Sequence, residues 1–204
     1  VRDHRGAVDL GVAVHGVDAR TITIEVNVTQ GLDFYMSGLP DSAVKESQHR
    51  VESSLKALGY FMPRNKVVVN LAPADIRKEG SAYDLPIALS ILQASGQLKI
   101  QNLESYMIMG ELSLDGLLRP IRGVLPIAIQ SRREGFKGFI LPAQNAAEAA
   151  IVNNLEIIGV KSLSEAIDFF TGQMVIEPLQ VDTREIFQRE INQHDTDFKD
   201  VQGQ

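Results

Sequence analysis

Residues 69–86 read VNLAPADIRKEGSAYDLP, and they contain the change from strand to helix that decides the fold. The β-branched run from Lys66 to Leu71 predicts a short buried strand. The charged stretch from Ala72 to Gly80 predicts a loop. Ser81 to Ser95 is rich in leucine, isoleucine and alanine, which predicts a largely buried helix; Pro86 is tolerated near its first turn. We therefore expect a strand, a loop and a helix in direct succession.

Strand and helix patterns alternate on both sides of this stretch. Thr21 to Val28 alternates polar and apolar residues, which is typical of a half-buried strand. Asp41 follows a turn and is expected to cap a helix that ends at Gly59. Ser162 and Glu165 form a capping box for a last helix. Between these we expect a helix at 124–134, a strand at 136–141, a helical segment at 145–152 and a strand at 155–160.

Asp115-Gly116 is a strong hairpin signal, because this pair suits a turn that needs positive φ. The hairpin strands are expected at 106–112 and 117–120. A hairpin among βα units makes the sheet mixed rather than purely parallel. The fold class predicted from the sequence is therefore α/β (α+β), with a mixed sheet and packed helices.

Composition bounds the class of protein. The chain has 204 residues, 44% of them hydrophobic, a formal net charge of −6 and no cysteine. It can bury a core, and it cannot form a disulfide or a cysteine-based zinc site. No apolar run approaches the roughly 18 residues of a membrane span, and no signal-peptide pattern opens the chain. We expect a cytoplasmic protein with no membrane partner.

Three regions are expected along the chain. Residues 1–13 are expected to be an N-terminal extension, in part an artificial addition, and residues 14–172 form the domain. Residues 173–204 are expected to be an acidic linker, since 176–204 hold seven acidic against three basic side chains. We expect this linker to be partly helical at 183–191 and to pack poorly on the core after about Glu177.

A family resemblance rests on three segments: GLPDSAVKES at 38–47, the stretch at 69–86, and GELSLDG at 110–116 followed by RPIRG at 119–123. Together they resemble the N-terminal domain of the ComM/YifB family of magnesium-chelatase-like AAA+ ATPases, over residues 14–172. The resemblance implies a degenerate Lon-protease-like domain of the ChlI type, with a ribosomal-protein-like two-layer core. It also implies a homo-hexameric motor that processes branched DNA with ATP and Mg²⁺.

Residues 197–204 resemble the entry segment of an AAA+ ATPase domain. The chain itself has no GxxxxGK[ST] phosphate-binding loop. We therefore expect an ATPase domain after Gln204, as the partner of this domain, and no cofactor bound by these 204 residues. We expect them not to be an enzyme, whereas the longer protein is expected to be an ATPase and DNA helicase.

Lon-type peptidases use a serine nucleophile activated by a lysine. Aligning Lys78-Glu79-Gly80 with their serine segment places Ala82 at the nucleophile position. Aligning Pro120–Gly123 with the turn before their lysine places Leu125 at the base position. Both members of the dyad are then absent. A register shifted by one residue would instead offer Ser81 as nucleophile; the alternative role of Ser81 is a helix cap.

Charged residues in the decisive stretch have two interpretations each. Asp84 either lines the degenerate site or accepts hydrogen bonds from backbone amides near a helix N-terminus. Arg77 and Lys78 either contact a phosphate or neighbouring subunit, or form an exposed, solvated pair. Lys45 and Glu46 are expected to face solvent.

A second basic group lies later in the chain, opposed by Glu134 alone. It is a candidate DNA surface or an ordinary solvated face. Its members are Arg119, Arg122, Arg132, Arg133 and Lys137.

The four histidines have no metal-ligand spacing, so no metal site is expected. They are His4, His15, His49 and His194.

Three functions are compatible with these patterns. The first is a non-proteolytic scaffold domain of a ring-forming AAA+ motor for branch migration, competence or recombination. The second is an ATP-dependent Lon-like serine protease domain with an unorthodox dyad. The third is a stand-alone binding module that has kept the fold.

Overall fold

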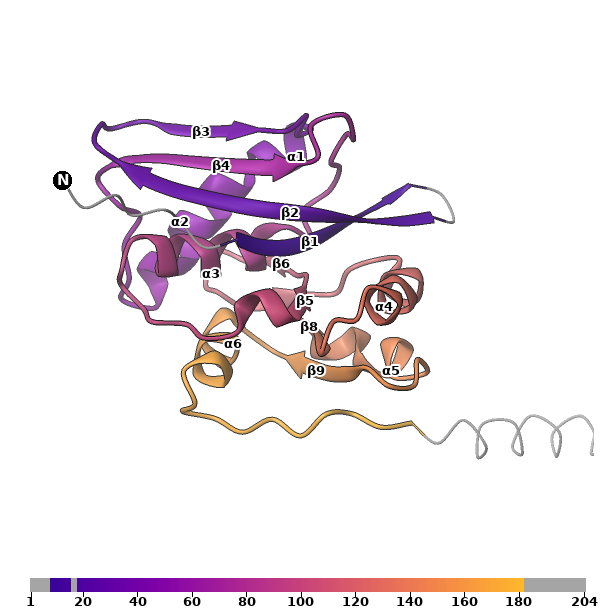
Figure 1. Cartoon of the computed structure of the whole chain (residues 1–204). Helices are drawn as coiled ribbons and strands as arrows, with labels where there is room; N and C mark the ends of the chain where they lie inside the picture. The colour runs from indigo at the N-terminus through magenta and orange to yellow at the C-terminus, as the bar shows by residue number, and fades with distance from the viewer. Residues whose placement is uncertain (1–7, 16–17, 182–204) are drawn as a thin grey trace, which may run out of the picture.

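The computed structural model describes residues 8–15 and 18–181 of the chain (Figure 1). In chain order the elements are β1 (Val8–His15), β2 (Asp18–Thr29), β3 (Phe34–Ser37), α1 (Ser42–Lys45), α2 (Ser47–Ala57), β4 (Lys66–Ala72), α3 (Asp84–Ala94), η1 (Leu103–Ser105), β5 (Tyr106–Ile108), β6 (Glu111–Leu112), β7 (Leu118–Arg119), α4 (Val124–Arg133), β8 (Gly138–Pro142), η2 (Ala143–Asn145), α5 (Ala146–Ala149), β9 (Glu156–Val160) and α6 (Leu163–Phe170).

The first sheet has four strands in the order β1-β2-β4-β3. β2 pairs antiparallel with both β1 and β4, whereas β3 pairs parallel with β4. The predicted alternation in β2 is confirmed, because Ile22, Ile24 and Val26 are buried while Glu25 and Asn27 are exposed. The buried face of this sheet packs against α2 and α3 (Figure 1).

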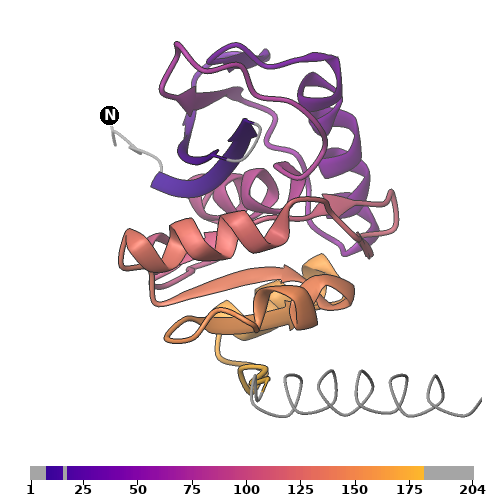
Figure 2. The same ribbon diagram turned by 90° about the vertical axis from the view of Figure 1, so that its right-hand side faces the viewer.

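The second sheet is parallel, with strand order β5-β8-β9. All five residues of β8 are buried, as expected for a parallel strand covered on both faces. Ile140 faces the core that contains α3, whereas Phe139 and Leu141 face a second core formed with α4 and α5. Figure 2 shows α4 lying across this second sheet.

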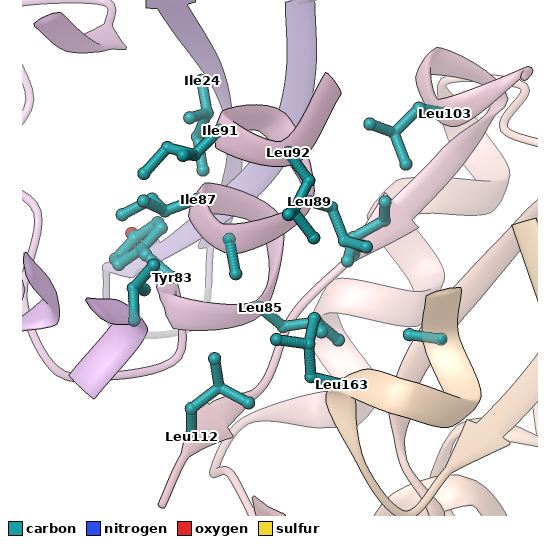
Figure 3. Close-up of a cluster of buried hydrophobic side chains, with 14 of the residues drawn as sticks. Ile24, Tyr83, Leu85, Ile87, Leu89, Ile91, Leu92, Leu103, Leu112 and Leu163 are labelled. Carbon is teal, nitrogen blue, oxygen red and sulfur yellow. The ribbon is translucent and has the colours of Figure 1, made fainter. Parts of the chain in front are cut away.

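Helix α3 lies between the two sheets and is buried around its whole circumference. Figure 3 shows its side chains pointing in several directions, with Ile87 and Ile91 near Ile24 of β2, and Leu85 near Leu163 of α6. Each fully buried leucine or isoleucine contributes roughly 1.5–3 kcal/mol of transfer free energy. The predicted buried helix is therefore confirmed, but the predicted two-layer core is wrong. The buried apolar side chains of α3 all belong to one core, which has a sheet on each side. A second core lies between the other face of the second sheet and helices α4 and α5.

The hairpin at Asp115-Gly116 is confirmed, since β6 pairs antiparallel with β7. It is shorter than predicted because the expected strand 106–112 breaks at Met109-Gly110. There the Gly110 amide donates to the Ala82 carbonyl, and the Leu85 amide donates to the Gly110 carbonyl. The hairpin forms a separate two-stranded sheet, so the mixed character of the first sheet comes from β3 instead.

The two ends of the domain differ from their predicted boundaries. Residues 8–13, assigned to an N-terminal extension, lie in β1 and pair with β2. At the other end, residues 176–181 run along the domain, and Ile176 and Val181 pack against its two cores. Poor packing after Glu177 is therefore only partly correct. The linker from residue 182 onward, including the predicted helix at 183–191, lies outside the described residues.

Candidate functional site

The two positions aligned with a Lon-type dyad carry no reactive group. Ala82 lies just before α3, and Leu125 is the second residue of α4. Both are half-buried and pack against the same core, the one that contains Phe139. The structure therefore brings these positions to one core, but neither side chain can attack a carbonyl or take up a proton.

Ser81 has a different bonding partner from the lysine that a peptidase would need. Its hydroxyl donates to Oε2 of Glu111, and Oε1 of Glu111 lies 4.0 Å from Nε of Arg119. The predicted capping role is wrong, because Tyr83 occupies the N-cap of α3 and makes no side-chain capping bond. Because the Ser81 hydroxyl is bonded to Glu111 on β6, it does not bond to a backbone amide at the start of α3.

Lys78 is completely buried, which contradicts the prediction of an exposed, solvated side chain. Its Nζ donates to the carbonyl oxygen of Gly38 at 2.6 Å and to that of Pro73. Burial lowers the pKa of the Lys78 amine, and the nearby Asp75 carboxylate opposes this change. An ammonium enclosed by backbone carbonyls has no access to a phosphate or to the Ser81 hydroxyl.

The burial of Lys78 follows from the pairing of two loops. The Lys78 amide donates to the Leu39 carbonyl at 3.0 Å, and the Asp41 amide donates to the Lys78 carbonyl at 2.9 Å. Asp41 also accepts from Gly80 at 3.2 Å, and as predicted it caps α1 by accepting from Val44 at 2.7 Å. We call residues 38–41 and 73–80, joined in this way, the loop clasp.

Gly38 allows the first loop of the clasp to lie close to the backbone of β4. Its φ is +97°, and a Cβ added there would lie 2.0 Å from the Leu71 carbonyl oxygen. Leu39 follows with a φ of +56° and an exposed side chain. A non-glycine residue in this region is strained, so the surrounding hydrogen bonds must hold it in place.

Asp84 lies at the start of α3 and belongs to a buried ionic network. It accepts from Nε of Arg50 at 2.6 Å, from the Ser47 hydroxyl at 2.5 Å and from the Leu112 amide at 3.0 Å. Burial raises the pKa of the Asp84 carboxyl, and the hydrogen bonds from Arg50, Ser47 and Leu112 oppose that rise. In turn, the bond to Asp84 raises the pKa of Arg50.

This network differs from both interpretations of Asp84. One backbone amide does bond to it, but its main partner is a cation on α2. Arg50 and Ser47 were missed by sequence reasoning. The available signal was their spacing of three residues, which places them on one face of α2 beside the buried Val51. The network joins α2, α3 and β6, so its evident role is to fix three elements.

The exposed basic residues are spread over several elements. Arg77 is 66% exposed and lies 3.2 Å from Glu79. Arg122 precedes α4, while Arg132 and Arg133 end it, and ten helical residues separate these ends by about 15 Å. Arg119 projects from β7, 65% exposed. These positions are accessible to a polyanion, but they do not form one compact pocket.

Lys137 lies apart, just before β8. Its Nζ is 3.9 Å from Glu156 and 5.5 Å from the ring centroid of Tyr106. The Tyr106 hydroxyl and the Glu156 carboxylate raise the pKa of Lys137.

The remaining residues named from the sequence form no site among the described residues. Lys45 and Glu46 are exposed, as expected, and so is His49. Among residues 8–15 and 18–181 there is no cluster of metal-ligating side chains, while His4 and His194 lie outside these ranges. Of the helices described, none has the length and apolar character needed to cross a membrane.

The similarity of this chain to a known family covers the segments described above. A family model described as "Subunit ChlI of Mg-chelatase" matches residues 24–145, which include the loop clasp, α3 and the hairpin. The chain belongs to the magnesium-chelatase ChlI-like family. In this chain, among residues 8–15 and 18–181, the clasp and the Asp84 network are the two places where charged side chains are buried.

Named relatives agree with this assignment. The chain is 42% identical to the uncharacterized protein YifB of Salmonella typhimurium over 172 residues, which are 83% of this chain and 34% of that protein. It is 38% identical to the competence protein ComM of Haemophilus influenzae over 193 residues, 93% of this chain and 37% of that protein. Lon protease 2 of Bacillus subtilis is 28% identical over 177 residues, 78% of this chain and 32% of that protein. The ChlI-like chain thus spans about a third of the length of these relatives.

Proposed function

We propose that this chain is a non-proteolytic scaffold domain of a longer magnesium-chelatase-like AAA+ ATPase. The observation that carries the proposal is the state of the groups that peptide hydrolysis would need. Ala82 and Leu125 stand at the dyad positions, the Lys78 amine is bonded to two carbonyls, and the Ser81 hydroxyl is bonded to Glu111. Lys78 and Ser81 carry groups that could take part in peptide hydrolysis, but each group is hydrogen-bonded to the domain itself.

The proposed fold over residues 14–172 is Lon-protease-like. The similarity to Lon protease 2 and the mixed α/β arrangement support it. We propose that the domain, without its dyad, serves to contact neighbouring domains and subunits of the longer protein. This is why a scaffold function fits better than a stand-alone module.

The proposed motor belongs to the longer protein. ATP and Mg²⁺ bind to an ATPase domain after residue 204, the protein assembles as a homo-hexamer in the cytoplasm, and DNA is its partner. The matched residues make up only about a third of each relative, which supports a further domain, and the name of the competence protein ComM supports a role in competence. The exposed arginines on β7 and α4 are the proposed points of contact.

Peptide cleavage by the longer protein, with and without ATP and Mg²⁺, tests the scaffold proposal. We expect no hydrolysis of casein or of a fluorogenic peptide above the level seen with Ser81→Ala, because no hydroxyl is paired with a free amine. ATP hydrolysis by the same preparation shows that the motor is intact. Cleavage that disappears in Ser81→Ala would contradict the scaffold function and support a protease with an unorthodox dyad.

A titration of labelled DNA tests the surface. Reversing Arg132 and Arg133 to glutamate in the longer protein should weaken binding and reduce the salt slope by about one unit per lost phosphate contact. Lys45→Glu with Lys56→Glu is the matched control, since both lysines are exposed on other helices. An equal loss in both pairs, or no loss in either, would exclude α4 as a specific DNA surface.

A further inference from the structure

β9 is the last strand of the second sheet. It pairs with β8 on one side, and its other side is an edge with outward-facing backbone groups. Unpaired edges of this kind are templates for pairing with an extended segment.

The chain returns along this edge after α6. In Figure 1 residues 176–181 run beneath β9 in the direction opposite to the strand. The Leu179 amide donates to the Ile157 carbonyl at 2.9 Å. Ile176 and Val181 pack against the two different cores, one at each end of the segment. The exposure pattern also alternates, because Ile176 and Pro178 are half-buried whereas Glu177 and Leu179 are exposed.

The contact is nevertheless loose compared with the core. Within residues 8–15 and 18–181, one backbone hydrogen bond joins this segment to β9. Leu179 remains 42% exposed. A cavity of about 800 Å³ is lined by Pro178–Val181 together with residues 152–156 and Lys137. A segment held by three half-buried side chains and one backbone bond can detach without unfolding the domain.

We infer that the outer edge of β9 is a peptide-docking edge, and that its occupant is this chain's own segment 176–181. Recognition is by strand addition, with an apolar side chain at each end and a backbone donor between them. Occupation covers an edge that would otherwise pair with another chain, and it sets the direction in which the chain leaves the domain. The inference is independent of the proposed ATPase function.

Amide hydrogen exchange of the 204-residue chain, followed by NMR, tests this docking. After correction for intrinsic rates, we expect the Leu179 amide to exchange at least about tenfold more slowly than that of Gln180, which donates no hydrogen bond to a described residue. Equal rates for the two amides would overturn the inference.

Variants identify the anchors. Ile176→Ser with Val181→Ser should bring the exchange rate of Leu179 close to that of Gln180. Val175→Ser is the matched control, since Val175 is 85% exposed, and it should leave the protection of Leu179 unchanged. Protection that survives the double substitution, or is lost equally in the control, would contradict docking through these two side chains.

Discussion

Two buried charges lie close together in the chain and are stabilised in opposite ways. Asp84 has a counter-ion, Arg50, and further donors from Ser47 and Leu112. Lys78 has only neutral acceptors, the carbonyls of Gly38 and Pro73. Burying a charge is costly unless it is paired and hydrogen-bonded. The Asp84 carboxylate bonds directly to its counter-ion, whereas the Lys78 ammonium bonds to carbonyls and has the Asp75 carboxylate nearby. The carboxylate therefore joins three elements as an ion pair, whereas the ammonium joins two loops.

The largest expected effect comes from breaking the ion pair. Asp84→Asn leaves the Arg50 cation without its counter-ion and should lower the free energy of unfolding by about 3–5 kcal/mol. The double variant Arg50→Met, Asp84→Leu should lose less than Asp84→Asn alone, because no uncompensated charge remains. Urea unfolding monitored by circular dichroism measures both. A double variant less stable than Asp84→Asn would show that the pair itself is strongly stabilising.

Removing the lysine should have a smaller effect. Lys78→Met keeps most of the side-chain volume but leaves two carbonyls without a donor, which should cost about 1–3 kcal/mol. Lys45→Met is the control on an exposed lysine and should change stability by less than about 0.5 kcal/mol. Similar stability of the two variants would mean that the clasp does not depend on the amine.

The contribution of Lys78 to the free energy of unfolding should depend on pH. Burial lowers the pKa of Lys78 below its ordinary value of 10.5. Between the lowered pKa and 10.5, the unfolded chain holds more protons at this residue than the folded chain does. The contribution of Lys78 to stability therefore rises with pH across this window. The difference in unfolding free energy, wild type minus Lys78→Met, should be larger at the alkaline end; a difference that shrinks as the pH rises would contradict the burial of the charge.

The smallest expected change in stability is that of a substitution at Arg77, the residue before Lys78. Arg77 is mostly exposed and pairs with Glu79 at the surface, so Arg77→Ala should change the unfolding free energy by no more than about 0.5 kcal/mol. Urea unfolding beside Lys78→Met makes the comparison between neighbours direct. If Arg77→Ala lowered the free energy of unfolding as much as Lys78→Met, any substitution in this loop would be destabilising, and the burial of Lys78 would not explain its effect.

Local signals were sufficient for much of the fold. The alternation in β2, the Asp41 cap, the Asp115-Gly116 turn and the Ser162 cap depend on residues close together in the sequence, and each was predicted. The position of α3 between the two larger sheets was missed, although α3 is apolar on all sides, which is typical of a helix covered on both sides.

The burial of Lys78 could not be predicted in the same way. It depends on the Gly38–Asp41 loop, some forty residues earlier, which supplies a carbonyl and two backbone bonds. In isolation, Arg77-Lys78-Glu79 has the composition of a solvated loop. Arg50 was missed for the same reason, because its partner Asp84 lies 34 residues away.

We conclude that Lys78 is a structural cation, closed off from solvent and substrate. NMR detection of the lysine side-chain ammonium protons near neutral pH tests it most directly. Lys78 should give a resolved ammonium signal that exchanges slowly with water, because its protons are bonded to carbonyls, whereas exposed Lys45 should exchange too fast to be seen. An ammonium of Lys78 that exchanges as fast as that of Lys45 would show an accessible amine, available for chemistry or for a phosphate, and would contradict a purely structural role for Lys78.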